Sequence, residues 1–290
     1  MFINLIIFIV LVVLIVVVTR NVMIYNIRKL SILLRWNNKV VGQILGYATS
    51  TPELISAIVA GSIGLIETSI FNVMSSNFIN VILVIIVTML NKRTASIVKK
   101  KFTYDYIIIL ITLMVPVFLS VTGLASTIYA IPLLLLIYLV YIYGSKYVDY
   151  FAAENEELEL EKQSYRVGVK NLKRRKIKVS NKKKIFKSTI MLILSLIALY
   201  LLGSALSSVL EKLGKDLGVP EIILGIIMGF VTSVPELLTF ITSYHRHRRY
   251  KDPNKDKGAV EVINNLATSN VSNLTIIQTV AIIAFIIFAT

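Results

Sequence analysis

The sequence predicts an all-α polytopic membrane protein with about eight transmembrane helices. Of its 290 residues, 56% are hydrophobic, and the mean hydropathy is +0.77, whereas soluble domains carry about 45–50% apolar residues. The net charge of +15 does not indicate nucleic-acid binding, because the basic residues fall in loops between apolar runs. A third observation is a hexamer that occurs twice inside apolar runs, as T-S-T-P-E-L at 49–54 and as T-S-V-P-E-L at 232–237.

The two hexamers each place a carboxylate and a proline at membrane depth. A charge there costs at least about 2.5–3.5 kcal/mol, so Glu53 and Glu236 are predicted to be functional. Pro52 and Pro235 lack an N–H and break the helix, which frees backbone carbonyls one turn earlier. Irregular backbone is tolerated at that depth where it lines a cavity or is buried in protein. Carboxylate, hydroxyl and carbonyl oxygens suit Ca²⁺ or Na⁺, so we interpret the hexamers as halves of one cation site.

Composition argues against enzymatic chemistry. The chain has no cysteine and only two histidines, His245 and His247, which excludes disulfides and thiolate metal sites. An intramembrane hydrolase could use Ser50 or Ser233, but no histidine lies in the spans and no lysine accompanies either serine to activate it. We therefore expect a protein that is not an enzyme and that needs no cofactor.

The first half of the chain, residues 1–145, is predicted to hold five spans. The first is an uncleaved helix, because it is long enough to cross and has neither a basic leader nor a small-residue cleavage site. A basic stretch at 20–39, which includes Trp36, is either an amphipathic segment at the membrane interface or a basic loop. The fourth and fifth spans carry no central charge and are expected to be scaffold. The five spans are Phe2–Val18, Val40–Ser62, Leu65–Asn91, Tyr104–Val121 and Leu124–Tyr143.

A charged segment separates the two halves. Residues 146–187 are first acidic and then basic, and we expect a solvated cytoplasmic linker with one short helix. Contact of its basic part with lipid headgroups is the alternative. The second half, 188–290, is predicted to hold three spans, the first two joined by a short loop at Glu211–Glu221. These spans are Ser188–Leu210, Ile222–Tyr244 and, approximately, Ala259–Ala289.

Each hexamer is followed by a second shared pattern, N-x-x-[ST]-S-N-x-x-N, at 72–80 and 265–273. Two linked motifs that recur in the same order indicate an internal repeat. Basic loops follow the odd-numbered spans, which predicts an N-terminus outside the cell. Since an odd number of spans lies between the repeats, they have opposite polarity. Inverted repeats that meet at the bilayer midplane are typical of secondary transporters.

At these motifs the chain resembles the cation/calcium exchanger superfamily, and most nearly its sodium/calcium exchanger branch of prokaryotic size. The resemblance is specific over 42–81 and 225–274, where that family has a T-S-x-P-E-L signature and a G-N-x-x-G-S-N-x-x-N/D arm. It implies a secondary active antiporter in the cell membrane that exchanges Na⁺ for Ca²⁺ by alternating access. Na⁺ and Ca²⁺ would be the transported substrates. We expect a monomer without nucleic-acid partners.

The resemblance also implies a ligand set. The two glutamates, Glu53 and Glu236, would bridge the central cations. Hydroxyls, arm-end amides and backbone carbonyls would complete the site: Thr49, Ser50, Ser76, Thr232, Ser233 and Ser269; Asn80 and Asn273; Gly46 and Gly229.

Three departures from the family pattern bear on these expectations. Asn273 stands where many sodium/calcium exchangers have an aspartate, which leaves two central carboxylates. Ser75 and Thr268 replace glycines in the arms, which predicts looser helix packing there. The family usually has ten spans and this sequence has eight, so the last pair is missing, as in a shortened relative or a truncated chain.

Two other functions remain open at the level of sequence. Because both arms end in asparagine, the glutamates could titrate, giving proton-coupled exchange or exchange of Mg²⁺ or another divalent cation; a sodium-independent, pH-driven flux would favour this. A non-transporting membrane scaffold would instead use Glu53 and Glu236 as a buried structural pair. Such a scaffold would show no ion-dependent thermal stabilisation.

Overall fold

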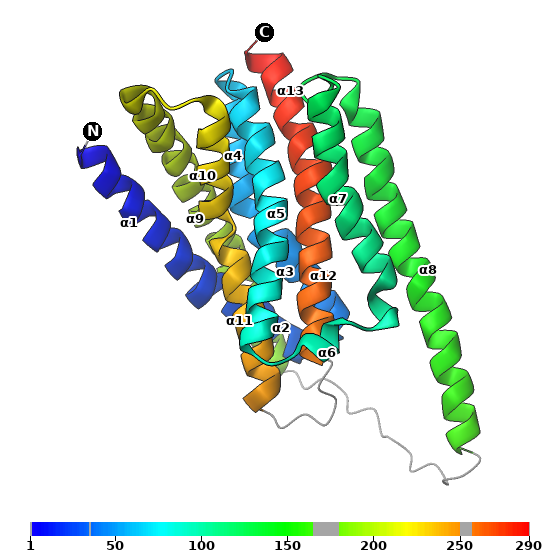
Figure 1. Cartoon of the computed structure of the whole chain (residues 1–290). Helices are drawn as coiled ribbons and strands as arrows, with labels where there is room; N and C mark the ends of the chain where they lie inside the picture. Colours follow the sequence, from blue (N-terminus) through cyan, green and yellow to red (C-terminus); the bar gives the residue numbers. More distant parts are fainter. Residues whose placement is uncertain (1, 35, 165–179, 250–256, 290) are drawn as a thin grey trace.

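The computed structural model describes residues 2–34, 36–164, 180–249 and 257–289, and every regular element in them is a helix. Among these residues, seven helices are long and apolar enough to cross a membrane. The eighth expected crossing, Val40–Ser62, consists of two helices of 12 residues each, α3 (Asn38–Thr49) and α4 (Thr51–Ser62). Both chain termini lie at the same end of the bundle (Figure 1), as an even number of crossings requires.

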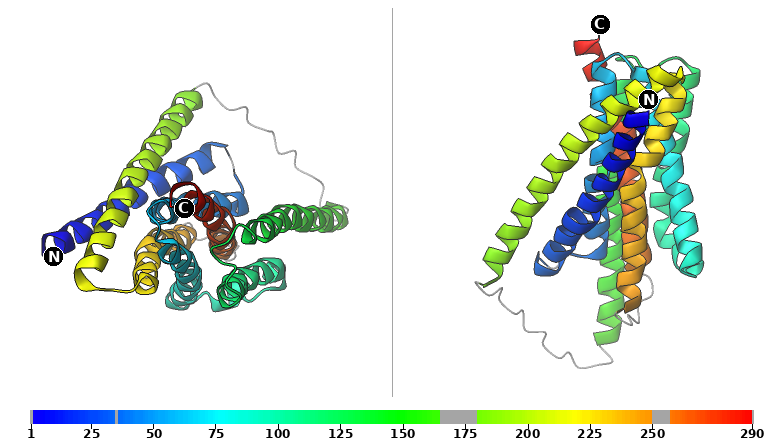
Figure 2. Two further views of the ribbon diagram at one scale, coloured as in Figure 1. Left: turned by 90° about the horizontal axis from the view of Figure 1, so that it is seen from above. Right: turned by 90° about the vertical axis from the view of Figure 1, so that its left-hand side faces the viewer.

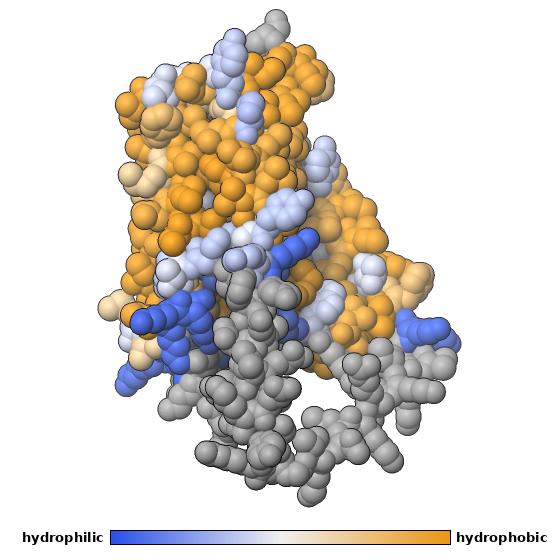
Figure 3. Space-filling view, turned by 90° about the vertical axis from the view of Figure 1, so that its right-hand side faces the viewer, coloured by the Kyte–Doolittle hydropathy of each residue, from blue (hydrophilic) through white to orange (hydrophobic). Residues whose placement is uncertain are grey.

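The outer surface of the bundle is apolar over most of its height. Figure 3 shows one face that is hydrophobic in its upper part, with hydrophilic residues gathered toward the lower end. Many large apolar side chains, such as Leu110 and Ile287, are more than half exposed. Contiguous exposed apolar surface of this kind matches the hydrocarbon core of a bilayer. The chain is a polytopic membrane protein.

Two interlocked hairpins form the centre of the bundle. The first consists of α3, α4 and α5 (Ile66–Leu90), and the second of α10 (Glu221–Thr232), α11 (Val234–Arg249) and α12 (Lys257–Ser272). In Figure 1, α4 and α10 lie in the upper half and α3 and α11 in the lower half, so the two repeats run in opposite directions. Half-helix α3 packs along α12, and α10 packs along α5. Each repeat therefore buries its half-helix against the arm of the other repeat.

Glycines permit this close cross-repeat packing. A Cβ on Gly46 would lie 2.7 Å from the carbonyl oxygen of Asn265, and one on Gly229 would lie 2.7 Å from the carbonyl oxygen of Asn72. Any larger residue would have to push two helix backbones apart. The Cβ on Gly229 would also collide with Ser75 Oγ. The looser packing expected at Ser75 is therefore wrong, because the glycines of the facing half-helix, not of the arm, set the spacing.

The remaining helices flank the hairpins on two sides. On one side, α1 (Phe2–Val18), the π-helical turn η1 (Thr19–Ile24) and α2 (Tyr25–Leu34) form one continuous rod that packs against α9 (Ser180–Leu217). On the other side lie α7 (Thr103–Val121) and α8 (Ala130–Ser164) (Figures 1 and 2). The basic stretch after Val18 is thus largely helical, so the alternative of a basic loop is wrong. The short elements are α6 (Thr94–Ile97), η2 (Lys100–Phe102), η3 (Asn273–Ile277) and α13 (Gln278–Phe288).

Several helix ends differ from the expected spans. Helix α8 begins at Ala130, after a series of turns, and continues to Ser164. Helix α9 already begins at Ser180, so of the charged segment only 165–179, with its basic run at 173–176, lies outside the described residues. The loop expected at Glu211–Glu221 shrinks to 218–220, because α9 continues until Gly218, whose positive φ of 64° ends it. Runs of Glu and Lys are good helix formers, so charge alone does not end a helix.

Candidate cation site

Each hexamer breaks its helix at the serine, near the middle of the bundle. Helix α3 ends at Thr49 and α10 at Thr232, and Ser50 and Ser233 adopt ψ values near 0° before the next helix begins. The prolines then fall in the first turn of α4 and α11, where a missing N–H costs nothing. The helix breaks predicted from the prolines are confirmed. The glutamates of the hexamers consequently lie at helix N-termini, whose dipoles favour negative charge.

Glu53 and Glu236 are completely buried and close enough to repel each other. One of their four oxygens, Glu236 Oε1, accepts a hydrogen bond, from Ser269 Oγ at 3.0 Å. Glu236 Oε2 and both Glu53 oxygens have no hydrogen-bond donor. A buried charged oxygen without a donor carries the full cost of desolvation, more than about 1–3 kcal/mol for each such atom. The pair therefore requires protons or cations.

Hydroxyls and amides from both repeats surround this pair. Ser50 Oγ lies 2.9 Å from Ser269 Oγ, which the Asn80 amide also approaches at 3.5 Å. In the other repeat pairing, Ser76 Oγ lies 3.5 Å from Thr232 Oγ1 and donates to the Gly229 carbonyl at 3.3 Å. The hexamer of each repeat thus contacts the arm of the other.

The other expected ligands occupy more local positions. Thr49 Oγ1 donates to the Leu45 carbonyl at 2.9 Å, and Ser233 Oγ donates to the Gly229 carbonyl at 2.8 Å. Ser50 Oγ donates to the Gly46 carbonyl at 3.0 Å. The Gly46 and Gly229 carbonyls also accept the backbone N–H groups of Ser50 and Ser233, each at 3.2 Å. All twelve expected residues are buried: Gly46, Thr49, Ser50, Glu53, Ser76, Asn80, Gly229, Thr232, Ser233, Glu236, Ser269 and Asn273.

A further layer of polar residues holds the broken segments, and the sequence had not identified its role. Ser56 Oγ donates to the Glu53 carbonyl at 3.0 Å and accepts from the Asn72 amide at 2.8 Å. Thr239 Oγ1 likewise donates to the Glu236 carbonyl at 2.8 Å and accepts from the Asn265 amide at 2.5 Å. The signal in the sequence was a hydroxyl three residues after each glutamate. Such matched contacts fix the first turns that carry the carboxylates.

The family model described as sodium/calcium exchanger protein matches residues 4–147 and 187–288, which include both hexamers and both arms. The chain belongs to the sodium/calcium exchanger family. The exchanger is accordingly a multi-pass membrane protein of a cation antiporter family, whose members are transporters and not enzymes. Comparison with curated proteins and with solved structures gave no match.

The donor set of the exchanger is made of oxygens. No group of three or more His, Cys, Asp or Glu side chains that could hold a metal ion occurs among the described residues. Carboxylate, hydroxyl, amide and carbonyl oxygens are ligand types that suit hard cations rather than softer transition metals. The two carboxylates together carry a formal charge of −2 when ionised, which one divalent cation or two monovalent cations can balance.

Proposed function

We propose that the exchanger transports Ca²⁺ against Na⁺, with Glu53 and Glu236 as the charged ligands that both ions share. The observation that supports this proposal most is the group of three buried carboxylate oxygens that accept no hydrogen bond. One Ca²⁺ neutralises both carboxylates, and so do two Na⁺ ions. The two kinds of ion therefore compete for the same oxygens and are not bound together.

The surrounding geometry favours Ca²⁺ and Na⁺ over the alternatives. Ca²⁺ accepts six to eight oxygens in irregular arrangements, whereas Mg²⁺ demands a near-ideal octahedron and keeps several waters. The proposed ligands come from α3, α4, α5, α10, α11, α12 and the π-helical turn η3, and they include both hydroxyls and amides. Hydrolase chemistry is not supported, because Ser50 and Ser233 donate their hydroxyl protons to helix carbonyls rather than to a base.

Alternating access would arise from motion of the flanking rod against the hairpins. Helices α1, η1, α2 and α9 meet α3 and α10 through a cluster of apolar side chains that includes Met23, Leu45, Leu206 and Met228. Apolar contacts are non-directional, so such a surface can slide with little loss of bonding. The N-terminus would lie outside, and the ends of α8 and α9 that flank 165–179 would lie in the cytoplasm. Ion occupancy would shift the two states through their different affinities.

Transport in proteoliposomes tests this proposal. With Na⁺ inside and a Na⁺-free medium outside, we expect Ca²⁺ uptake that stops when an ionophore collapses the Na⁺ gradient. Mg²⁺ and pH should be followed in parallel with fluorescent indicators. Ca²⁺ uptake driven by a pH gradient without Na⁺ would contradict Na⁺ coupling and favour proton coupling. If none of these ions is transported and none of them raises the melting temperature, the non-transporting scaffold is the function that the experiment favours.

A further inference from the structure

Four asparagines meet where the arm α5 crosses the arm formed by α12 and η3. They are Asn77, Asn80, Asn270 and Asn273, and all four are fully buried. The Asn77 amide donates to the Asn270 carbonyl at 3.2 Å, and the Asn270 amide donates to the Asn77 carbonyl at 3.2 Å. The Asn77 amide also donates to the Thr112 carbonyl of α7 at 3.3 Å. Backbone carbonyls can only accept, so the orientation of these two side chains is not ambiguous.

The orientation of Asn77 and Asn270 determines that of the arm-end asparagines. With their NH₂ groups held by carbonyls, each presents its Oδ1 to the partner arm. Asn77 Oδ1 accepts from Asn273 Nδ2 at 3.1 Å, and Asn270 Oδ1 accepts from Asn80 Nδ2 at 3.2 Å. The Oδ1 atoms of Asn80 and Asn273 are left buried without a donor. Since the NH₂ groups of Asn80 and Asn273 bond the partner arm, the oxygen is the atom that each side chain can offer to a cation.

We propose that Asn77 and Asn270 are positioning residues that turn the amide oxygens of Asn273 and Asn80 toward a bound cation. The proposal rests on the proposed function, since it assigns those oxygens to the Ca²⁺ and Na⁺ site. It also explains why asparagine suits position 273. A carboxylate there would place an oxygen against Asn77 Oδ1, two acceptors without a proton between them. The network therefore selects a site with two charges.

A double-mutant cycle between positions 77 and 273 tests this inference. Asn77→Leu keeps the side-chain volume but releases the Asn273 amide, which can then turn a donor toward the cation. We expect the apparent Ca²⁺ affinity, measured as the midpoint of Ca²⁺-dependent thermal stabilisation, to fall about tenfold or more, as when supporting groups around metal ligands are removed. Asn273→Asp has no donor to misplace, so it should raise the affinity by a larger factor in the Asn77→Leu background than in the wild-type background.

The control and the contradicting outcomes separate this inference from the proposed function. Asn26→Leu removes another buried amide, in α2, whose NH₂ bonds the Val22 carbonyl at 2.7 Å, and should leave the Ca²⁺ midpoint unchanged. A purely structural role for Asn77 would lower the melting temperature of the ion-free protein and leave the Ca²⁺ midpoint as in wild type. Equal effects of Asn273→Asp in both backgrounds would also overturn the inference. Absence of any Ca²⁺ stabilisation in wild type would instead refute the proposed function.

A second inference comes from a difference between the two ends of the bundle. Near the basic loops, Arg28 of α2 forms a salt bridge with Glu261 of α12, with 2.8 Å between Nη2 and Oε1. The same nitrogen donates to Ser243 Oγ of α11 at 3.1 Å, and Ser243 Oγ donates to Glu261 Oε1 at 2.6 Å. Glu261 is fully buried. This cluster joins the flanking rod to the second hairpin.

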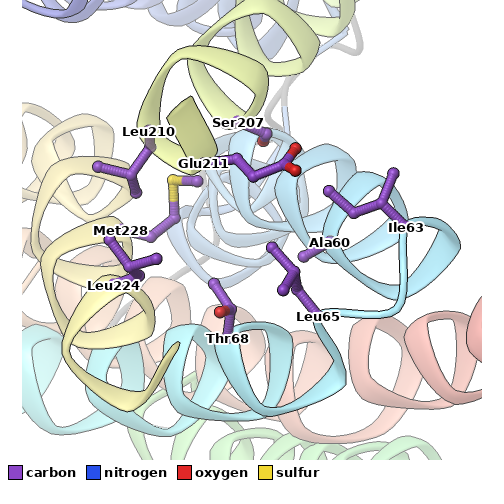
Figure 4. Close-up of a pocket in the computed structure, with 9 residues that line it drawn as sticks. All are labelled: Ala60, Ile63, Leu65, Thr68, Ser207, Leu210, Glu211, Leu224 and Met228. Carbon is purple, nitrogen blue, oxygen red and sulfur yellow. The ribbon is translucent and has the colours of Figure 1, made fainter. Parts of the chain in front are cut away.

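The repeat places the corresponding residues at the opposite end. Glu211 precedes the first glycine of α10 by the same number of residues as Arg28 precedes the first glycine of α3. In the arms, Thr68 of α5 and Glu261 of α12 lie at the same distance before the shared asparagine pattern. Glu211 and Thr68 line a pocket there together with Ala60, Leu224 and other residues. Figure 4 shows Glu211 of α9 and Thr68 of α5 on opposite sides of this pocket. One end of the bundle thus has a pocket at the position where the other end has a salt bridge.

We infer that the Arg28–Glu261 salt bridge closes the mouth near the basic loops, and that the pocket at Glu211 and Thr68 is the mouth for cations at the other end. Thr68 of this pocket lies one turn along α5 from Asn72, whose Oδ1 accepts from Thr232 Oγ1 at 3.3 Å. On the closed side, Glu261 lies one turn from Asn265, whose amide donates to Thr239 Oγ1 at 2.5 Å. This inference rests on the proposed alternating access, but it predicts which residues a reagent can reach rather than the rate of ion transport.

Single cysteines test this assignment, because the chain has none of its own. Leu224→Cys in the pocket and Val41→Cys at the matching position of the first repeat form a symmetric pair. We expect a maleimide to label Leu224→Cys several-fold faster than Val41→Cys in purified protein without Ca²⁺. Arg28→Gln should raise labelling at position 41 several-fold and leave position 224 unchanged, which also shows that the fold is intact.

Reversal of the charges completes the test. The pair Arg28→Glu with Glu261→Arg should return labelling at position 41 to its slow rate. Labelling at position 41 that does not respond to Arg28→Gln would overturn the assignment, even if the transport experiment succeeded. Equal labelling of Leu224→Cys and Val41→Cys in protein that keeps Arg28 and Glu261 would overturn it as well.

Discussion

Replacement of Glu53 or Glu236 by glutamine is expected to reduce Na⁺-dependent Ca²⁺ uptake at least about thirtyfold. Loss of one charge from a buried charge interaction costs about 2–5 kcal/mol, and each ~1.4 kcal/mol corresponds to a factor of ten in affinity. Glutamine has the same shape as glutamate, so the helix breaks and the cross-repeat contacts remain. The measurement is initial Ca²⁺ uptake into proteoliposomes that contain equal amounts of each variant.

The stability of the ion-free protein provides the complementary observation. Each substitution removes one of two buried carboxylates that repel each other, so the melting temperature without Ca²⁺ or Na⁺ should not fall and is expected to rise. Glu67→Gln is the matched control, because Glu67 lies exposed in the first turn of α5 and should affect neither property. Normal uptake by Glu53→Gln or Glu236→Gln would refute the role of these residues.

Replacement of Gly46 or Gly229 by alanine is expected to destabilise the exchanger and to abolish transport. The new Cβ would lie 2.7 Å from a backbone carbonyl of the facing arm, and backbone cannot move aside as a side chain can. Overpacking of this kind costs about 1–3 kcal/mol or more, which outweighs the roughly 1 kcal/mol by which alanine favours a helix over glycine. Separation of the half-helix from the arm would also displace the hydroxyls that surround the glutamates.

A matched glycine in α9 separates this packing effect from helix propensity. A Cβ on Gly203 would first meet Cγ2 of Ile55 at 3.3 Å, a side-chain contact that can adjust. Gly203→Ala should therefore leave the melting temperature unchanged or raise it slightly. Thermal unfolding followed in detergent compares all three variants. Gly46→Ala and Gly229→Ala proteins as stable as Gly203→Ala would contradict the close cross-repeat packing.

The central pair of carboxylates was predictable because its signal is local and occurs twice. A proline next to a glutamate inside an apolar run specifies a broken helix and a buried charge whatever the rest of the chain does. The number of spans between the two copies then gives their opposite polarity. The family match spans both hexamers and both arms. The cross-repeat contacts of Ser50 with Ser269 follow from the same symmetry.

Other features depend on tertiary contacts that no local pattern encodes. Arg28 belongs by sequence to a basic stretch, and only the fold brings it to Glu261. Asn77 and Asn270 are part of the shared pattern, but their role appears only when the arms cross. The π-helical turn η3 begins at Asn273, whereas α5 runs through Asn80 without interruption, and the two sequences do not differ in a way that predicts this.

Equilibrium binding of radiolabelled Ca²⁺ to the purified exchanger tests the central claim most directly, since it needs neither vesicles nor an orientation. We predict saturable Ca²⁺ binding that Na⁺ displaces, and that is lost when Glu53→Gln and Glu236→Gln are combined but kept in Glu67→Gln. Ca²⁺ binding that survives the combined substitution, or that Na⁺ does not displace, would contradict a site built on these two glutamates.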